Sequence, residues 1–317
     1  MSSSKISENP VVTVGYFLEK APDELMIEVL AGEDGLDKKQ IVSGRIQKLG
    51  LALAGFTHYI HEGRIQIVGQ SEISYLSQLE SPKRIEAIRN LDLEKICCIL
   101  VTKNLKPPQD LLDIADEKRL PVLRTAQISS NAITLVSNFL EEILAPQTTL
   151  HGVLMGMYGL GVLIKGESGI GKSECALDLI ARGHHLISDD TVLVKKIGER
   201  LEGCAPDLTY EHLEIRGLGI INIRHLFGVT SVSKREKIEL CIELKKWNEV
   251  VKVERLGLDT QEEEILALKI TKFILPVSAG RNLSTLVETA VRVYLLRSAG
   301  FDAAQKLIEK HTALLGR

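Results

Sequence analysis

The chain has 317 residues, enough for two domains that each bury a core of their own. Its composition, 44% hydrophobic, 26% charged and 4% aromatic, is typical of a globular protein and excludes a disordered or fibrous chain. The net charge of −3 gives no electrostatic reason to expect a nucleic acid as partner.

The sequence also gives expectations about compartment. The first residues are polar and lack the apolar core of a signal peptide, and the longest apolar stretch, residues 153–164, is too short to span a bilayer. We therefore expect a cytoplasmic protein without a membrane partner. The five cysteines form no C-x-x-C pair and are odd in number, so we expect buried free thiols.

The first half of the chain alternates between strand-like and helix-like segments. The predicted strands cover residues 11–14, 64–67, 96–101 and 120–123. The predicted helices cover residues 38–49, 82–90, 109–117 and 129–144. This alternation predicts a layered α/β domain.

A segment of small and polar residues, 145–149, then interrupts the pattern and contains Pro146. We interpret it as an interdomain linker. The sequence thus predicts an N-terminal domain over residues 1–144 and a second domain over residues 145–317.

The second half opens with a complete phosphate-binding motif between a strand-like segment, residues 161–165, and a helical apolar face that ends before Gly183. In such a loop the backbone N–H groups and the helix N-terminus face the phosphates, Lys172 reaches the β/γ oxygens and Ser173 can ligate Mg²⁺. The alternative is a glycine-rich turn with a solvated lysine. The motif consists of Gly166, Glu167, Ser168, Gly169, Ile170, Gly171, Lys172 and Ser173.

Two adjacent carboxylates follow the next predicted strand, residues 185–188. Asp189 and Asp190 are expected beside the γ-phosphate, where one can hold Mg²⁺ and the other can orient or deprotonate a nucleophile. Two neighbouring carboxylates should also raise each other's pKa, which suits a group that accepts and returns a proton. The alternative is that the pair forms a turn or a helix cap.

A second unusual stretch, residues 213–222, places two charged residues in an apolar, glycine-containing segment. Burying Glu214 and Arg216 would cost free energy unless each has a partner. Glu214 could be a second Mg²⁺ ligand, and a structural salt bridge is equally compatible with the residues. Two amphipathic helices are predicted after this, over residues 283–297 and 302–311.

Together these segments resemble HPr kinase/phosphorylase, a bacterial enzyme family that acts on a seryl residue of HPr, the phosphocarrier protein of the sugar phosphotransferase system. The resemblance covers most of the second half, whereas the first half is similar only in its βα layout. It rests on residues 149–153, the phosphate motif, and residues 187–190, 213–222, 254–257 and 280–282.

The resemblance implies an α/β fold in which an N-terminal layered α/β domain precedes a phosphate-loop kinase domain with C-terminal helices. It places His151, Lys172, Asp190 and Arg255 on the family's active positions, the loop on ATP, and Ser173 and Glu214 on Mg²⁺. A packed core position is the alternative for His151. It further implies a homohexamer in which Arg281 or the last helix takes part in docking HPr.

The activity implied is Mg²⁺-dependent phosphorylation of the HPr seryl residue with ATP or pyrophosphate, and removal of that phosphate by phosphorolysis, which yields pyrophosphate. Such an enzyme regulates carbon metabolism. Residues 276–281 match the loop associated more with dephosphorylation, and here Ser278-Ala279 includes a serine where the family commonly has a basic residue. The alternatives from the residues themselves are a small-molecule kinase, since the loop does not report the acceptor, and a nucleotide-sensing regulatory module.

Overall fold

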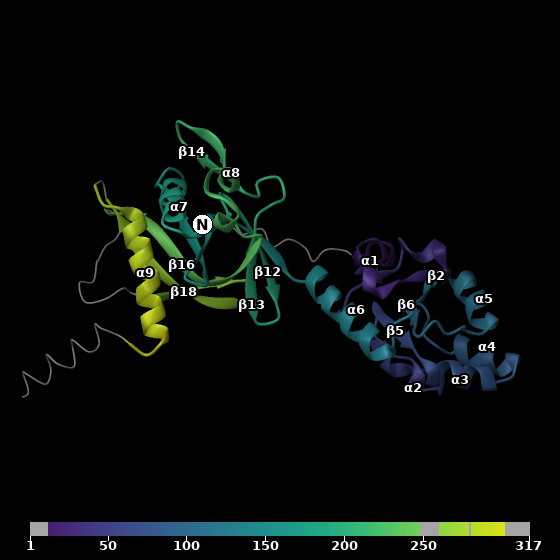
Figure 1. Cartoon of the computed structure of the whole chain (residues 1–317). Helices are drawn as coiled ribbons and strands as arrows, with labels where there is room; N and C mark the ends of the chain where they lie inside the picture. Colours follow the sequence, from purple (N-terminus) through teal and green to yellow (C-terminus); the bar gives the residue numbers. More distant parts are fainter. Residues whose placement is uncertain (1–11, 248–259, 279, 302–317) are drawn as a thin grey trace, which may run out of the picture. The chain divides into compact units, whose positions relative to one another are not determined.

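The computed structural model describes residues 12–247, 260–278 and 280–301. The chain divides between Ala145 and Pro146 into two compact units, an N-terminal and a C-terminal one (Figure 1). Strand β8 already begins at Gln147, so only the first two residues of the predicted linker lie outside helix and strand. We keep the assignment of residues 1–144 and 145–317 as separate domains as a proposal.

The N-terminal unit is built on a five-stranded sheet in which β4, β5, β6 and β7 are parallel and β2 is antiparallel. Helices cover both of its faces, as the predicted layered α/β arrangement requires (Figure 1). In sheet order the strands are β2 (Glu28–Ala31), β7 (Val122–Arg124), β6 (Ile96–Val101), β5 (Arg64–Val68) and β4 (Gln47–Lys48).

The continuous apolar run of β6 explains this layering. Cys98 and Leu100 pack in a cluster with α1 (Val14–Lys20) and α6 (Ser129–Ile143), whereas Ile99 and Val101 pack with helices on the opposite face. A strand buried on both faces needs apolar residues at every position rather than at every second one. The opposite face carries α2 (Gly50–Leu53), α3 (Gln70–Gln78), α4 (Ser81–Arg89) and α5 (Gln109–Lys118).

The helix predicted over residues 38–49 is wrong. That stretch contains β3 (Gln40–Ile41) and β4, where Ile41 pairs with Val12 and Gln47 with Gln66. Pairing with neighbouring strands outweighs a helical preference that Gly44 already weakens. The strand predicted over residues 11–14 is shortened to β1 (Val12–Thr13), because Thr13 caps α1 by accepting a hydrogen bond from the Tyr16 N–H at 3.1 Å.

The C-terminal unit holds a nine-stranded mixed sheet centred on the twelve-residue strand β16. The start of β16 pairs with β13, and its end lies parallel between β10 and β18. Along the sheet the strands are β11 (His185–Ser188), β9 (Val153–Met157), β10 (Leu160–Gly166), β16 (Arg235–Lys246), β13 (Arg200–Cys204), β12 (Thr191–Ile197) and β8 (Gln147–His151), with β18 (Leu268–Val277) on β16 and β17 (Thr260–Ile265) on β18.

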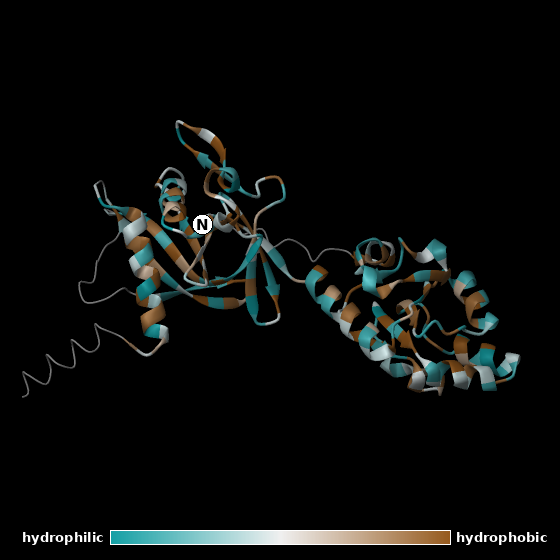
Figure 2. Cartoon of the chain, viewed as in Figure 1, coloured by the Kyte–Doolittle hydropathy of each residue, from teal (hydrophilic) through white to brown (hydrophobic). Residues whose placement is uncertain are grey.

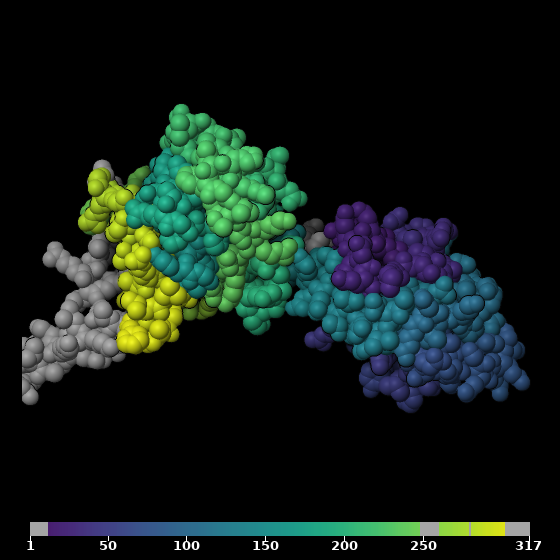
Figure 3. All heavy atoms as spheres, viewed as in Figure 1, coloured from purple at the N-terminus to yellow at the C-terminus, as the bar shows by residue number. Residues whose placement is uncertain are grey.

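Alternate residues of these strands build two cores. Val162 and Ile242 face α7 (Lys172–Ala181) and α9 (Leu283–Ser298), whereas Leu163 and Cys241 face the cluster on the other side. Figure 2 shows hydrophobic positions in brown along these strands and on the helices, and α9, in yellow, lies against α7, in teal, in Figure 3. The helix predicted over residues 283–297 is confirmed, and the one over residues 302–311 lies outside the described residues.

All five cysteines are free, and burial raises the pKa of Cys175, on α7, to about 12, so its thiol stays neutral. Within the described ranges no helix has the length and apolar character needed to cross a membrane.

Smaller elements complete the fold. The remaining elements are the hairpin β14 (His212–Ile215) and β15 (Gly219–Asn222), α8 (Ile223–Phe227), and the 3₁₀ turns Asp23–Leu25, Glu33–Gly35, Thr57–Tyr59 and Val229–Ser231.

The core around β16 gives a stability prediction. Ile242 is fully buried (0% exposed), so Ile242→Ala leaves a cavity between the sheet and α7 and should lower the free energy of unfolding by about 2–5 kcal/mol. Urea titration followed by circular dichroism measures this change. The matched control is Leu226→Ala, at a side chain that is 62% exposed, which should change stability by less than about 0.5 kcal/mol. Equal losses in the two variants would contradict this assignment of the core.

Candidate active site

The glycine-rich motif forms a tight loop between β10 and α7, in the strand-loop-helix order that phosphate binding requires. Gly169 and Gly171 have φ values of +80° and +100°, a left-handed conformation that other residues adopt with strain. A Cβ atom added to Gly166 would lie 2.9 Å from the Leu244 carbonyl oxygen. Gly171 is the N-cap of α7, so the first N–H groups of this helix face the loop.

The lysine of the motif is folded into the loop. Lys172 is 7% exposed, and its Nζ donates hydrogen bonds to the carbonyl oxygens of Gly166, at 2.9 Å, and Glu167, at 3.0 Å. These bonds hold the ammonium group inside the curve of the loop. A solvated lysine on a simple turn, the alternative interpretation, is therefore wrong.

Asp189 lies directly against the hydroxyl of the motif. The Ser173 Oγ donates to Oδ1 of Asp189 at 3.0 Å and to Oδ2 at 3.3 Å, and the Glu214 N–H donates to the same Oδ2 at 3.2 Å. Asp189 is only 6% exposed. Three segments that are distant in sequence, α7, the end of β11 and the hairpin, thus meet at one carboxylate.

Burial raises the pKa of Asp189 above its ordinary value, and the hydrogen bonds from Glu214 and Ser173 offset part of that rise. The charge of Asp190 also raises this pKa but contributes less than burial. The direction agrees with the sequence-based expectation for Asp189. The cause that we expected, repulsion between adjacent carboxylates, is the smaller one.

Asp190 points to a different partner. Its φ of +63° places it in the left-handed region, which aspartate tolerates better than most residues. Its Oδ1 lies 3.2 Å from Nδ1 of His151, and the two side chains are 70% and 57% exposed. His151 is held there because β8 pairs with β12 in a register that sets it opposite Thr191. The alternative of a packed core histidine is wrong, since the ring is exposed.

The two carboxylates therefore share a turn but not an environment. They do form the connection between β11 and β12, as the alternative reading proposed, yet each also contacts a residue of the predicted site. Asp189 is buried against Ser173, a setting that suits a metal ligand. Asp190 is open to solvent beside His151, a setting that suits proton exchange with an incoming hydroxyl.

The hairpin β14–β15 corrects a further expectation. Glu214 and Arg216 are exposed rather than buried, and neither forms a salt bridge with any residue that the structure describes. The Nη2 atom of Arg216 lies 3.0 Å from the place that a Cβ on Gly169 would occupy. The guanidinium group therefore covers the phosphate loop, a placement that the sequence did not indicate because it depends on how the hairpin folds back.

The oxygen donors present fit Mg²⁺. This ion prefers carboxylate and hydroxyl oxygens and commonly takes one or two protein ligands together with substrate phosphates. Ser173 and Asp189 supply such oxygens, and the backbone of Glu214 touches the same carboxylate. Among the described residues no cluster of three or more His, Cys, Asp or Glu side chains could hold a metal by itself.

Arg281 contacts Trp247, and other predicted residues lie outside the described ranges. The Arg281 guanidinium stacks over the Trp247 ring at 4.7 Å, and Leu283 packs 3.8 Å from where a Cβ on Gly171 would lie. Arg255 and Ala279 lie outside the described residues.

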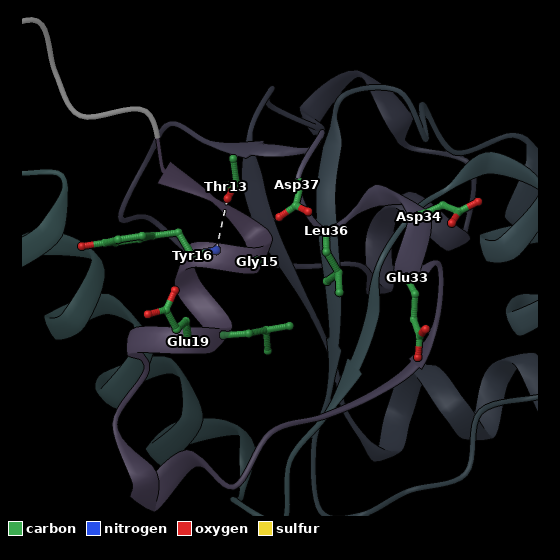
Figure 4. A pocket seen from close by; sticks show the side chains of 9 residues that line it. Thr13, Gly15, Tyr16, Glu19, Glu33, Asp34, Leu36 and Asp37 are labelled. Carbon is green, nitrogen blue, oxygen red and sulfur yellow. Dashed lines mark hydrogen bonds between the residues drawn. The ribbon is translucent and has the colours of Figure 1, made fainter.

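A hollow of about 680 Å³ occurs in the N-terminal unit (Figure 4). Its four carboxylates are exposed, and Figure 4 shows them at the surface of the hollow without convergence on one point. Lys172, Ser173 and Asp189 meet at the phosphate loop, so we propose that the active site lies in the C-terminal unit. The hollow is lined by Thr13, Gly15, Tyr16, Leu18, Glu19, Glu33, Asp34, Leu36 and Asp37.

Comparison with protein families agrees with this geometry. The model of the HPr serine kinase C-terminal domain matches residues 142–311, and that of the HPr serine kinase N terminus matches residues 12–140. The chain belongs to the HPr serine kinase family. It is therefore an enzyme of the kinase/phosphorylase class, and the predicted family resemblance is confirmed in both halves of the chain.

Members of this family similar to the chain occur in several bacteria. The HPr kinase/phosphorylase of Geobacter sulfurreducens is 46% identical over 287 residues, 90% of each chain. That of Caldicellulosiruptor bescii is 40% identical over 299 residues, 94% of this chain and 95% of the relative. The solved HPr(Ser) kinase/phosphatase of Coxiella burnetii is 36% identical, covers 50% of this chain and 97% of its own, and has a TM-score of 0.47.

Because Asp189 is buried, we predict that removing its charge has opposite effects on stability and on activity. Because the folded chain holds the Asp189 proton more tightly than the unfolded chain, the free energy of unfolding falls as the pH rises from the ordinary pKa of 3.8 through the raised one. Asp189→Asn keeps an acceptor for Ser173 and Glu214 but removes the charge. We expect the variant to be at least as stable as the parent at neutral pH and to lose phosphate transfer.

Urea titrations at neutral and acid pH measure this difference. The stability advantage of Asp189→Asn should shrink as the pH approaches 3.8, and Asp207→Asn, at an exposed carboxylate of the same unit, should show no such trend. A variant that is less stable than the parent at neutral pH, yet equal to it at acid pH, would show that the charge stabilises the fold.

Proposed function

We propose that this enzyme is a Mg²⁺-dependent protein serine kinase that phosphorylates a seryl residue of HPr with ATP or pyrophosphate, and that it removes the phosphate by phosphorolysis. The observation that supports it most is the placement of Asp189 on Ser173 with Asp190 beside it, open to an acceptor. The relatives named HPr kinase/phosphorylase support HPr as the acceptor. Such an enzyme would serve in regulating carbon metabolism.

In this proposal the phosphate loop and Lys172 bind the ATP phosphates, and Arg216 covers the loop from the hairpin. Ser173, Asp189 and Glu214 would hold Mg²⁺, which when bound neutralises charge on the phosphate oxygens. Most of the rate enhancement comes from this positioning and charge neutralisation, because phosphoryl transfer needs little covalent chemistry from the protein.

Asp190 carries the proton in both directions. In the forward reaction its carboxylate accepts the proton of the seryl hydroxyl while the seryl oxygen attacks the γ-phosphorus, and ADP leaves. In the reverse reaction inorganic phosphate attacks the phosphoseryl phosphorus, pyrophosphate forms, and Asp190 returns the proton to the seryl oxygen. His151, 3.2 Å away, orients Asp190. Arg255 would stabilise charge on the transferring group.

A proton-transfer test follows from this role. Asp190→Asn should lower transfer from labelled ATP to purified HPr by roughly 10²- to 10⁴-fold, since removal of a general base has effects of that size. ATP binding, measured by equilibrium dialysis, should persist because Lys172 and the loop are unchanged. Asp207→Asn, an exposed acid elsewhere in the same unit, serves as the matched control and should keep full transfer.

The same assay separates the other functions. Label that appears only on a panel of metabolites, and never on HPr, would support a small-molecule kinase. A nucleotide-sensing module would keep its full function in Asp190→Asn, because sensing needs no base. Either result would overturn the protein-kinase proposal.

The family resemblance supports two further parts of the proposal, a homohexamer and a cytoplasmic location. Sedimentation equilibrium of the full chain should give a mass of six times 35.0 kDa. A monomer that is fully active on HPr would rule out the hexamer as the working form.

A further inference from the structure

Three parallel strands of the C-terminal unit end at the same edge of the sheet. Gly166, the last residue of β10, pairs with Leu244 of β16, and Lys246, the last residue of β16, pairs with Val277 of β18. The phosphate loop follows β10, and the segment ending at Arg281 follows β18. The end of β16 therefore lies between these two segments.

Consecutive side chains at the end of β16 reach the two segments. Lys246 Nζ lies 2.7 Å from Oε2 of Glu167 in the phosphate loop, and this hydrogen bond, with the charge, lowers the pKa of Glu167. Trp247, the single tryptophan of the chain, packs its ring against the Arg281 guanidinium at 4.7 Å. A cation over an aromatic face at this distance is attracted by the ring.

The position of Arg281 makes this contact relevant to phosphate binding. The next residue, Asn282, caps α9 by accepting a hydrogen bond from the Thr285 N–H at 2.8 Å. Leu283 follows and packs toward Gly171 of the phosphate loop. Arg281 therefore lies two residues before the side chain that contacts the phosphate loop. An arginine side chain loses rotamer entropy on binding an anion, and stacking on a ring reduces that loss in advance.

We propose that Trp247 is a positioning residue that holds the Arg281 guanidinium at the rim of the phosphate loop, where it binds the inorganic phosphate used in the reverse reaction. The assignment to phosphate rests on the proposed function. The Trp247–Arg281 contact itself does not, and it has a separate measurement. Lys246 fixes the loop on one side of β16, and Trp247 fixes the arginine on the other.

Kinetics of phosphorolysis test the role of Trp247. Trp247→Leu should raise the KM for inorganic phosphate about 2- to 5-fold, the size expected for one exposed cation–π contact, with kcat little changed. Trp247→Tyr keeps a ring face and should restore most of the affinity. Tyr59→Leu, which removes an exposed ring from the N-terminal unit, is the matched control and should leave the KM unchanged.

The double variant decides whether Trp247 acts through Arg281. Trp247→Leu should add no further increase in KM to a chain that already carries Arg281→Leu. If the tryptophan substitution costs the same in both backgrounds, or if Trp247→Tyr is as impaired as Trp247→Leu, the positioning role is wrong.

The fluorescence emission of Trp247 tests its contact with Arg281 without an activity measurement. Arg281→Ala uncovers one ring face, so acrylamide should quench Trp247 more strongly than in the parent chain, whereas Arg224→Ala should not change quenching. Unchanged quenching in Arg281→Ala would refute the pairing. A parent chain with the expected quenching but no transfer to HPr would refute the proposed function and leave the pairing supported.

Discussion

The buried carboxylate of Asp189 is the contact on which the arrangement of the site depends. Burying a charge costs free energy unless polar partners surround it, and here Ser173 and the backbone of Glu214 supply them. These bonds fix the start of α7, the tip of β11 and the hairpin relative to one another. The buried charge of Asp189 therefore lowers the stability of the fold, a cost that proteins commonly carry where a function needs the charge.

The separation of the two adjacent carboxylates follows from backbone geometry. The left-handed φ of Asp190 lets neighbouring side chains contact different partners, so one stays buried at Ser173 and the other stays in solvent at His151. A single turn thereby provides two carboxylates with different environments. Metal binding needs a fixed anion, whereas proton transfer needs one that a substrate can reach, and the turn supplies both.

The features that depend on local residue patterns could be predicted from the sequence. The phosphate loop needs glycines at fixed positions and a following helix, so its strand-loop-helix structure could be inferred from the motif alone. The apolar run of residues 96–101 likewise predicted a strand, and the structure shows that β6 is buried on both faces. The helix predicted over residues 38–49 failed because pairing with β1 and β5, which are separate in sequence, overrode local preference.

Contacts across the sheet could not be predicted in this way. Arg216 reaches Gly169 only because the hairpin folds over the loop, and Trp247 meets Arg281 only because β16 and β18 lie parallel. No spacing in the sequence encodes either distance. His151 was assigned by family resemblance alone, and the register of β8 on β12 gives the physical reason for its position beside Asp190.

A crystal structure of the full chain with Mg²⁺ and a non-hydrolysable ATP analogue tests the central claim most directly. We expect the ion within about 2.1 Å of the Ser173 hydroxyl oxygen, with Asp189 bound to it directly or through a water, and the γ-phosphate facing Asp190. An ion held by other residues, with Asp189 still bonded only to Ser173 and Glu214, would contradict the account.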